Sequence, residues 1–142
     1  MSVSELLSPL VGRLVFGWFF LSQAVMYAGD WGGTIALMNF RGIPGAAFIL
    51  ALTLLLLVMG SLSLIFGYHA RYGALILFTV TIVAMMSLHD YWLIRDAAAR
   101  ASEHQLFACH AAIAGGLLML IGLGPGPLAV DNAGKGGGPR KK

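Results

Sequence analysis

Long apolar stretches, separated by short groups of glycine, proline and charged residues, dominate this chain. A helix needs about 20 mostly apolar residues to cross the ~30 Å hydrocarbon core of a bilayer. Four stretches meet or nearly meet that length, over residues 10–28, 46–66, 72–92 and 106–123. Lipid offers the backbone no hydrogen-bond partner, so each stretch is expected to be helical throughout. The pattern predicts an all-α fold, a four-helix transmembrane bundle.

Glycine and proline mark the boundaries of these stretches. Residues 42–45 (Gly-Ile-Pro-Gly) precede the second stretch, and residues 124–127 (Gly-Pro-Gly-Pro) end the fourth, because proline cannot continue a helix. The Ala-rich residues 94–100 are expected to extend a helix above the membrane. Residues 1–131 therefore form one transmembrane domain. Residues 132–142 are basic and rich in glycine, and we expect them to be disordered.

The distribution of basic residues predicts the orientation of the bundle. An even number of spans places both termini on one side of the membrane. That side collects Arg13, Arg71, Lys135, Arg140, Lys141 and Lys142, and the opposite side collects Arg41, Arg95 and Arg100. Because cytoplasmic segments carry the excess of lysine and arginine, both termini are predicted to be cytoplasmic.

Composition agrees with a protein that is solvated mainly by lipid. Of the 142 residues, 58% are hydrophobic and only 11% are charged, well below the roughly 25% of a soluble domain. The net charge of +3 is small, and nucleic acid is not expected as a partner. Cys109 is the only cysteine, so the chain has no intramolecular disulfide or paired-cysteine redox site. The first residues lack the features of a cleaved signal, so the first span is expected to be retained.

Polar residues gather around the connection between the third and fourth spans. The candidate quinone or polar site comprises His89, Asp90, Trp92, Glu103 and His110. Glu103 and His110 share one helix face, and His89 and Asp90 would approach them from the antiparallel helix. A histidine and an acidic partner can hydrogen-bond a quinone carbonyl. In the alternative interpretation, the histidines reach water and the aromatic residues are ordinary membrane-boundary anchors. No metal ligands are predicted, because the spacing fits no zinc motif, and no catalytic residue is assigned.

Arg13 lies just inside the first span, where a charge needs a physical reason. The interpretation preferred from the sequence is snorkelling, in which the guanidinium reaches the membrane surface while its stem stays in lipid. The alternative is an ion pair inside the bundle, but no other helix carries an acidic residue at a matching depth. Small residues in the second and fourth spans, around Gly60 and over residues 111–116, are expected to allow close helix packing.

Several segments together resemble the DoxX family of small four-helix membrane proteins. They are Gly12-Arg13-Leu14 with Phe16-Gly17, Arg41-Gly42-Ile43-Pro44, Gly60 to Gly67 with Arg71, Ser87 to Trp92, Gln105-Leu106-Phe107 with Gly115-Gly116, and Gly124-Pro125-Gly126 through Asp131. The resemblance extends over residues 11–131. The chain departs from the family pattern at Cys109-His110, where relatives commonly have Lys-Asn, and it lacks their acidic residue before the second-span glycines. These departures favour a specialised or non-catalytic member.

The resemblance implies a multi-pass protein of the bacterial inner (plasma) membrane. Some family members are subunits of a thiosulfate:quinone oxidoreductase, and others are linked to membrane redox complexes. The leading hypothesis is an accessory subunit of a membrane complex linked to electron transfer or quinone chemistry, with the lipid bilayer and other membrane subunits as partners. The alternative is a quinone-linked oxidoreductase subunit with its own site near His89, Asp90 and His110. No cofactor is assigned, and quinone is the candidate. A transporter is disfavoured, because no span is broken at mid-membrane.

Overall fold

The computed structural model describes residues 2–88 and 91–133, and their regular elements are all helices. Four of these helices are long and apolar: α1 (Val3–Gly29), α3 (Ala46–Phe66), α4 (Ala70–Leu88) and α5 (Ala97–Leu123). Three shorter helices connect or follow them: α2 (Trp31–Phe40), the 3₁₀ helix η1 (Tyr91–Leu93) and α6 (Val130–Ala133). Each long helix reaches the length and hydropathy of a membrane span. The predicted all-α, four-helix transmembrane fold is confirmed.

Two of the long helices begin several residues before their apolar stretches, because polar side chains cap their first turns. At α1, the Ser2 side chain accepts from the backbone of Glu5 at 3.3 Å, and the Glu5 carboxylate accepts from the Ser2 backbone at 2.9 Å. This reciprocal capping box satisfies N–H groups that the helix itself leaves unpaired. At α5, Asp96 accepts from the Ala99 backbone at 2.8 Å. The helices therefore begin at Val3 and Ala97, ahead of the hydrocarbon-spanning stretches.

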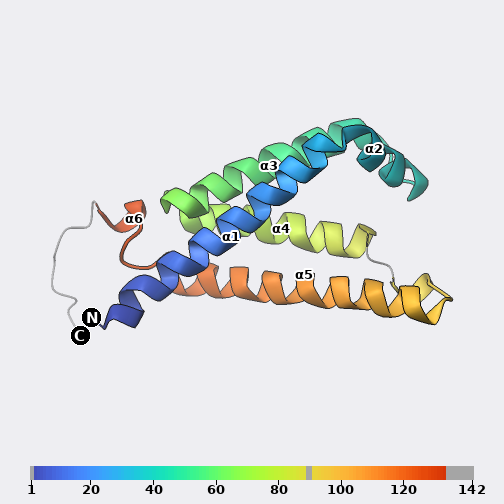
Figure 1. The fold of residues 1–142 in the computed structure, drawn as a ribbon. Coiled ribbons are helices and arrows are strands. Elements are labelled where there is room, and N and C mark those ends of the chain that lie inside the picture. The colour runs from blue at the N-terminus through green and yellow to red at the C-terminus, as the bar shows by residue number, and fades with distance from the viewer. Residues whose placement is uncertain (1, 89–90, 134–142) are drawn as a thin grey trace.

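The spans pack in series, α1 against α3, α3 against α4, and α4 against α5 (Figure 1). α1 runs obliquely across the other helices, and its first turns lie at the same end of the bundle as α6 (Figure 1). Buried side chains line the contacts between the helices. The central ones are Phe20 and Ala24 of α1, Leu57 and Leu64 of α3, Ala74 and Leu77 of α4, and Leu117 of α5.

Glycines set the separation of the helices at three crossings. A Cβ on Gly17 would lie 2.5 Å from a side-chain carbon of Ile65, so α1 and α3 meet there. A Cβ on Gly60 would lie 2.6 Å from Leu77 Cγ, where α3 meets α4. Phe16 of α1 reaches α5, where a Cβ on Gly116 would lie 2.5 Å from its ring. The close packing expected around Gly60 is present, and in residues 111–116 it is present at Ala114 and Gly116, whereas Ala111, Ala112 and Gly115 are exposed.

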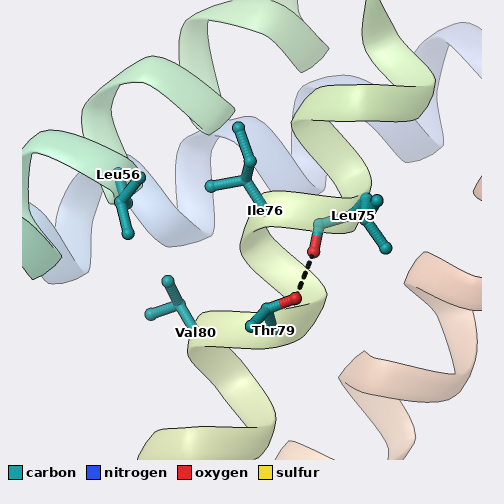
Figure 2. Close-up of a pocket in the computed structure, with 5 residues that line it drawn as sticks. All are labelled: Leu56, Leu75, Ile76, Thr79 and Val80. Carbon is teal, nitrogen blue, oxygen red and sulfur yellow. Dashed lines mark hydrogen bonds between the residues drawn. The ribbon is translucent and has the colours of Figure 1, made fainter.

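The outer surface of the spans is apolar, as lipid requires. A shallow groove between α3 and α4 is lined by Leu56, Leu75, Ile76, Thr79 and Val80 (Figure 2). Its one hydroxyl, on Thr79, donates to the Leu75 carbonyl of its own helix at 3.0 Å, so this donor is satisfied before it faces lipid. The groove is thus a lipid-facing furrow with a single, internally satisfied hydroxyl.

Two predicted segments extend beyond the described residues. His89 and Asp90 of the predicted third span lie outside them, and the chain is described again from Tyr91 in η1. In the predicted tail, Asn132 and Ala133 belong to α6, and residues 134–142 lie outside the described residues.

Candidate functional site

Arg13 is the most deeply buried charged side chain in the described part of the chain. It lies on one stripe of α1 with Gly17, Phe20 and Ala24, at spacings of four, three and four residues. Residues at these spacings occupy one face of a helix, and this face packs against the other spans. The side chain is 1% exposed. Snorkelling to the membrane surface, the interpretation preferred from the sequence, is therefore wrong, because the helical period directs Arg13 into the bundle.

The residues that meet Arg13 come from the segment that follows the last span. The guanidinium Nη2 donates to the Leu128 carbonyl at 3.4 Å, and Asp131 is the acidic group that interacts electrostatically with Arg13. Nε and Nη1 are buried without a hydrogen-bond acceptor among the described residues. Sequence reasoning missed Asp131 because it compared residues on spans at equal depth, whereas this carboxylate returns from beyond α5. Its signal was the Gly-Pro-Gly-Pro turn at residues 124–127, which directs the chain back towards the bundle.

Asp131 also caps the start of α4. Its Oδ1 accepts from the His69 backbone at 2.7 Å, and its Oδ2 accepts from the Ala70 backbone at 2.9 Å. The Asp131 backbone N–H donates in turn to the Gly67 carbonyl at 3.0 Å. The first N–H groups of a helix lack internal partners and attract negative charge. One carboxylate therefore caps α4, fastens the C-terminal segment to the α3–α4 turn and supplies a negative charge for Arg13.

Position 67, whose carbonyl accepts from the Asp131 backbone, can hold only glycine without strain. Gly67 ends α3 with φ of +68°, a left-handed conformation that side chains rarely adopt. A Cβ there would overlap Arg13 Nη1 and would lie 2.9 Å from the Cα of Ala129, which is itself only 2% exposed. We call Arg13, Gly67, Leu128, Ala129 and Asp131 the Arg13 cluster. Its close contacts connect α1, the α3–α4 turn and the C-terminal segment to one another.

The candidate quinone or polar site is only partly described. Trp92, in η1, is half exposed, and Glu103 and His110 lie half buried on one face of α5. The Nδ1 of His110 is 2.8 Å from the Leu106 carbonyl, so this nitrogen bonds to its own helix. His89 and Asp90 lie outside the described residues. In residues 2–88 and 91–133, no group of three histidine, cysteine or acidic side chains is placed to hold a metal ion.

An aromatic group forms at this end of α5, and sequence reasoning identified it only in part. The ring centroid of Tyr91 lies 5.3 Å from Trp92, 4.9 Å from His104 and 5.3 Å from Phe107. These edge-to-face contacts fall in the range that favours aromatic pairs. The sequence could have predicted these contacts, because residues 91 and 104–105 are equally distant from the middle of the hairpin formed by the third and fourth spans. We call these four residues the aromatic cluster; it joins η1 to α5.

Comparison with known proteins identifies the family of the chain. The sequence model of the DoxX family matches residues 8–90, which include Arg13, α3 and α4. The inner membrane protein YqjF of Escherichia coli (strain K12) is 29% identical over 122 residues, which cover 86% of this chain and 88% of YqjF. No solved structure matches the chain. The four apolar helices and the inner-membrane relative place this protein in the inner membrane as a multi-pass protein. The chain belongs to the DoxX family.

Proposed function

We propose that this protein is an accessory subunit of an inner-membrane complex and that it binds a partner subunit through the outer face of α5. The observation that carries the proposal is how little of α5 the bundle covers. Of its 27 residues, only Ala114 and Leu117 are buried. Ile113, Leu120 and Ile121 are partly buried against the core, and the opposite side of the helix is available for contacts outside this chain.

One stripe of the uncovered face of α5 consists of small residues, interrupted by Met119, which is 65% exposed. Along one side of the helix lie Ala108, Ala111, Ala112, Gly115 and Gly122, all exposed. A Cβ on Gly115 or Gly122 would meet no atom within 4 Å. Lipid packs equally well against large side chains, whereas small residues let a second helix approach its backbone closely. This face therefore favours a transmembrane helix of another subunit over lipid as its neighbour.

The exposed face of α3 provides the contrast. Its outward side chains are large, among them Phe48 at 75% exposure and Leu55 at 56%. Ala51 lies between them, about one turn from each, and is exposed as well. A partner helix would be held away from Ala51 by these two side chains. α3 thus presents an ordinary lipid-facing surface, and Ala51 serves as a control position for α5.

The test compares Gly115→Leu with Ala51→Leu. A tagged copy would be expressed in its native host, extracted with a mild detergent and analysed by blue-native electrophoresis with mass spectrometry of the associated proteins. We expect the wild type and Ala51→Leu to migrate in an assembly with a defined membrane subunit, and Gly115→Leu to migrate as the free protein. A wild-type protein that migrates alone, or an assembly that tolerates Gly115→Leu, would contradict the proposal.

We propose further that this complex works in electron transfer or quinone chemistry. Support comes from the DoxX resemblance and from the aromatic cluster, where Trp92 and Phe107 present rings with centroids 6.3 Å apart. Planar quinone headgroups stack on such surfaces, as ligands generally do in apolar sites with a few polar groups. Glu103 and His110 lie on the same helix as Phe107, and His89 and Asp90 remain predicted members of the site.

The quinone proposal is tested by the quinone that co-purifies with the protein. Trp92→Ala should lower the extracted quinone per mole of protein several-fold. Trp18→Ala is the matched control, because Trp18 is 69% exposed on the outer face of α1. Equal quinone content in both variants, or none in the wild type, would remove the support for a quinone site here.

A further inference from the structure

We infer that α2 is an interfacial helix that lies in the lipid boundary layer at the end of the bundle opposite α6. The sequence of α2, Trp-Gly-Gly-Thr-Ile-Ala-Leu-Met-Asn-Phe, contains no charged residue. Its 10 residues are too few to span the hydrocarbon core, and short apolar segments of this kind are typically interfacial or re-entrant. α2 lies between the ends of two spans, α1 and α3, at this end of the molecule (Figure 1).

Apart from Thr34 and the exposed Asn39, both faces of α2 are apolar. On the inner face, Met38 is 8% exposed and forms a core cluster with Ala46 and Leu50 of α3. On the outer side, Leu37 is 48% exposed and Phe40 is 86% exposed. A helix in water keeps a continuous polar face towards the solvent, whereas a helix with apolar residues on all sides and no polar face lies in a non-aqueous environment. The outer side of α2 therefore fits lipid and not water.

The packing of α2 also fixes its level in the membrane. At 21 residues, α3 is about 31 Å long, close to the ~30 Å hydrocarbon thickness, so Ala46 lies near one edge of the core. Leu50 lies four residues, or about 6 Å, further in. Met38 packs against both residues, and Tyr27 at the end of α1 packs against the same cluster. α2 is thus held at the boundary itself, where tyrosine and tryptophan are enriched.

The polar residues at the ends of α2 suit this position. Asp30 precedes the helix and accepts from the Gly33 backbone at 3.2 Å, and Arg41 follows it. Two charged residues at the ends and none between them allow the helix to lie along the headgroup layer with Leu37 and Phe40 in acyl chains. The surface continues the lipid-facing sides of α1 and α3, so the occupant we assign to it is the phospholipid of one leaflet.

Spin-label accessibility tests this assignment. In a Cys109→Ser background, Leu37→Cys and Phe40→Cys would be labelled with a nitroxide and reconstituted into phosphatidylcholine–phosphatidylglycerol vesicles. Val83→Cys, on the exposed side of α4, is the lipid reference, and a free water-soluble nitroxide is the aqueous one. We expect the ratio of oxygen to nickel-chelate collisions at both α2 positions to exceed the aqueous value several-fold, as at Val83. Nickel-dominated collisions would place α2 in water, and exclusion of both reagents would place it under protein; either result overturns the inference.

A second measurement leaves the α2 side chains intact. With Trp18→Phe and Trp92→Phe, Trp31 becomes the only tryptophan, and it begins α2 at 38% exposure. Lipids brominated close to the headgroup should quench its fluorescence more than lipids brominated near the chain end. Absence of quenching by either lipid would overturn the interfacial position.

Discussion

The substitution Asp131→Asn tests the Arg13 cluster most directly. It keeps the size of the side chain and one carbonyl oxygen, but it removes the negative charge that faces Arg13 and one of two acceptors at the start of α4. Arg13 remains buried, with Nε and Nη1 already lacking acceptors among the described residues. The variant therefore leaves a buried guanidinium without its counter-charge.

The expected cost follows from two terms. Asp131 is only half buried, so loss of its charge near Arg13 should cost about 1–2 kcal/mol, less than the ~3–5 kcal/mol for breaking a fully buried ion pair. Asparagine also keeps only one of the two acceptors that Asp131 offers to α4, and loss of one hydrogen bond costs about 1 kcal/mol. We therefore expect Asp131→Asn to lower the free energy of unfolding by about 2–3 kcal/mol. In an Arg13→Leu background the same change should cost only about 1 kcal/mol, because only the second acceptor at the start of α4 is lost.

The assay is unfolding by sodium dodecyl sulfate in dodecyl maltoside micelles, followed by circular dichroism and tryptophan fluorescence. Asp96→Asn is the matched control, because Asp96 caps α5 through the Ala99 backbone in the same chemical way, on an exposed site. It should change stability by about a few tenths of a kcal/mol. A cost of Asp131→Asn that is the same with and without the Arg13→Leu substitution would refute the charge coupling. If Asp131→Asn lowered the free energy of unfolding no more than Asp96→Asn does, Asp131 would act only as a helix cap.

Three further predictions use the same preparations. Gly67→Ala should lower the free energy of unfolding by about 1–3 kcal/mol, because the left-handed backbone and the contact with Arg13 both oppose a Cβ; an unchanged unfolding midpoint would contradict this. Gly17→Val should cost about 1–3 kcal/mol by separating α1 from α3, whereas Gly12→Val, with no atom within 4 Å of its Cβ, should be nearly neutral; equal costs would count against the crossing. Cys109, exposed on α5, should react in sealed vesicles with a lipid-soluble maleimide and not with a charged one; rapid labelling by the charged reagent would place this part of α5 in water.

Apolar length predicted the four spans well, and local polar residues shifted their ends. Each span hides its own backbone, so hydropathy alone identifies it. The earlier start of α1 depends on Ser2 and Glu5, a capping box that hydropathy does not record. The helix α2 was missed, because Gly32 and Gly33 resemble a loop, whereas Asp30 caps them into a helix.

The candidate sites were harder to predict, because their partners are remote in sequence. The burial of Arg13 depends on Asp131, which reaches it only after the chain turns back beyond α5. Depth matching between spans cannot find such a residue, since Asp131 belongs to none of them. In contrast, the contact between η1 and α5 was partly accessible, because a hairpin pairs residues at equal distance from its middle. Among the described residues, this contact is formed by aromatic side chains such as Tyr91 and Phe107.

The position of Asp131 also determines when the charge of Arg13 is neutralised. Arg13 lies 16 residues before the end of α1, about 24 Å along the helix, and therefore about 6 Å inside the hydrocarbon edge if that end meets the opposite boundary. At this shallow depth an unpaired arginine costs less than the roughly 2.5–3.5 kcal/mol of mid-membrane insertion, so α1 can insert with Arg13 snorkelling. In the folded chain the groups that meet Arg13, the Leu128 carbonyl and Asp131, come from the segment after α5. We therefore expect Arg13 to snorkel in the inserted chain until the Arg13 cluster forms, and the formation of this cluster connects the first span to the last segment.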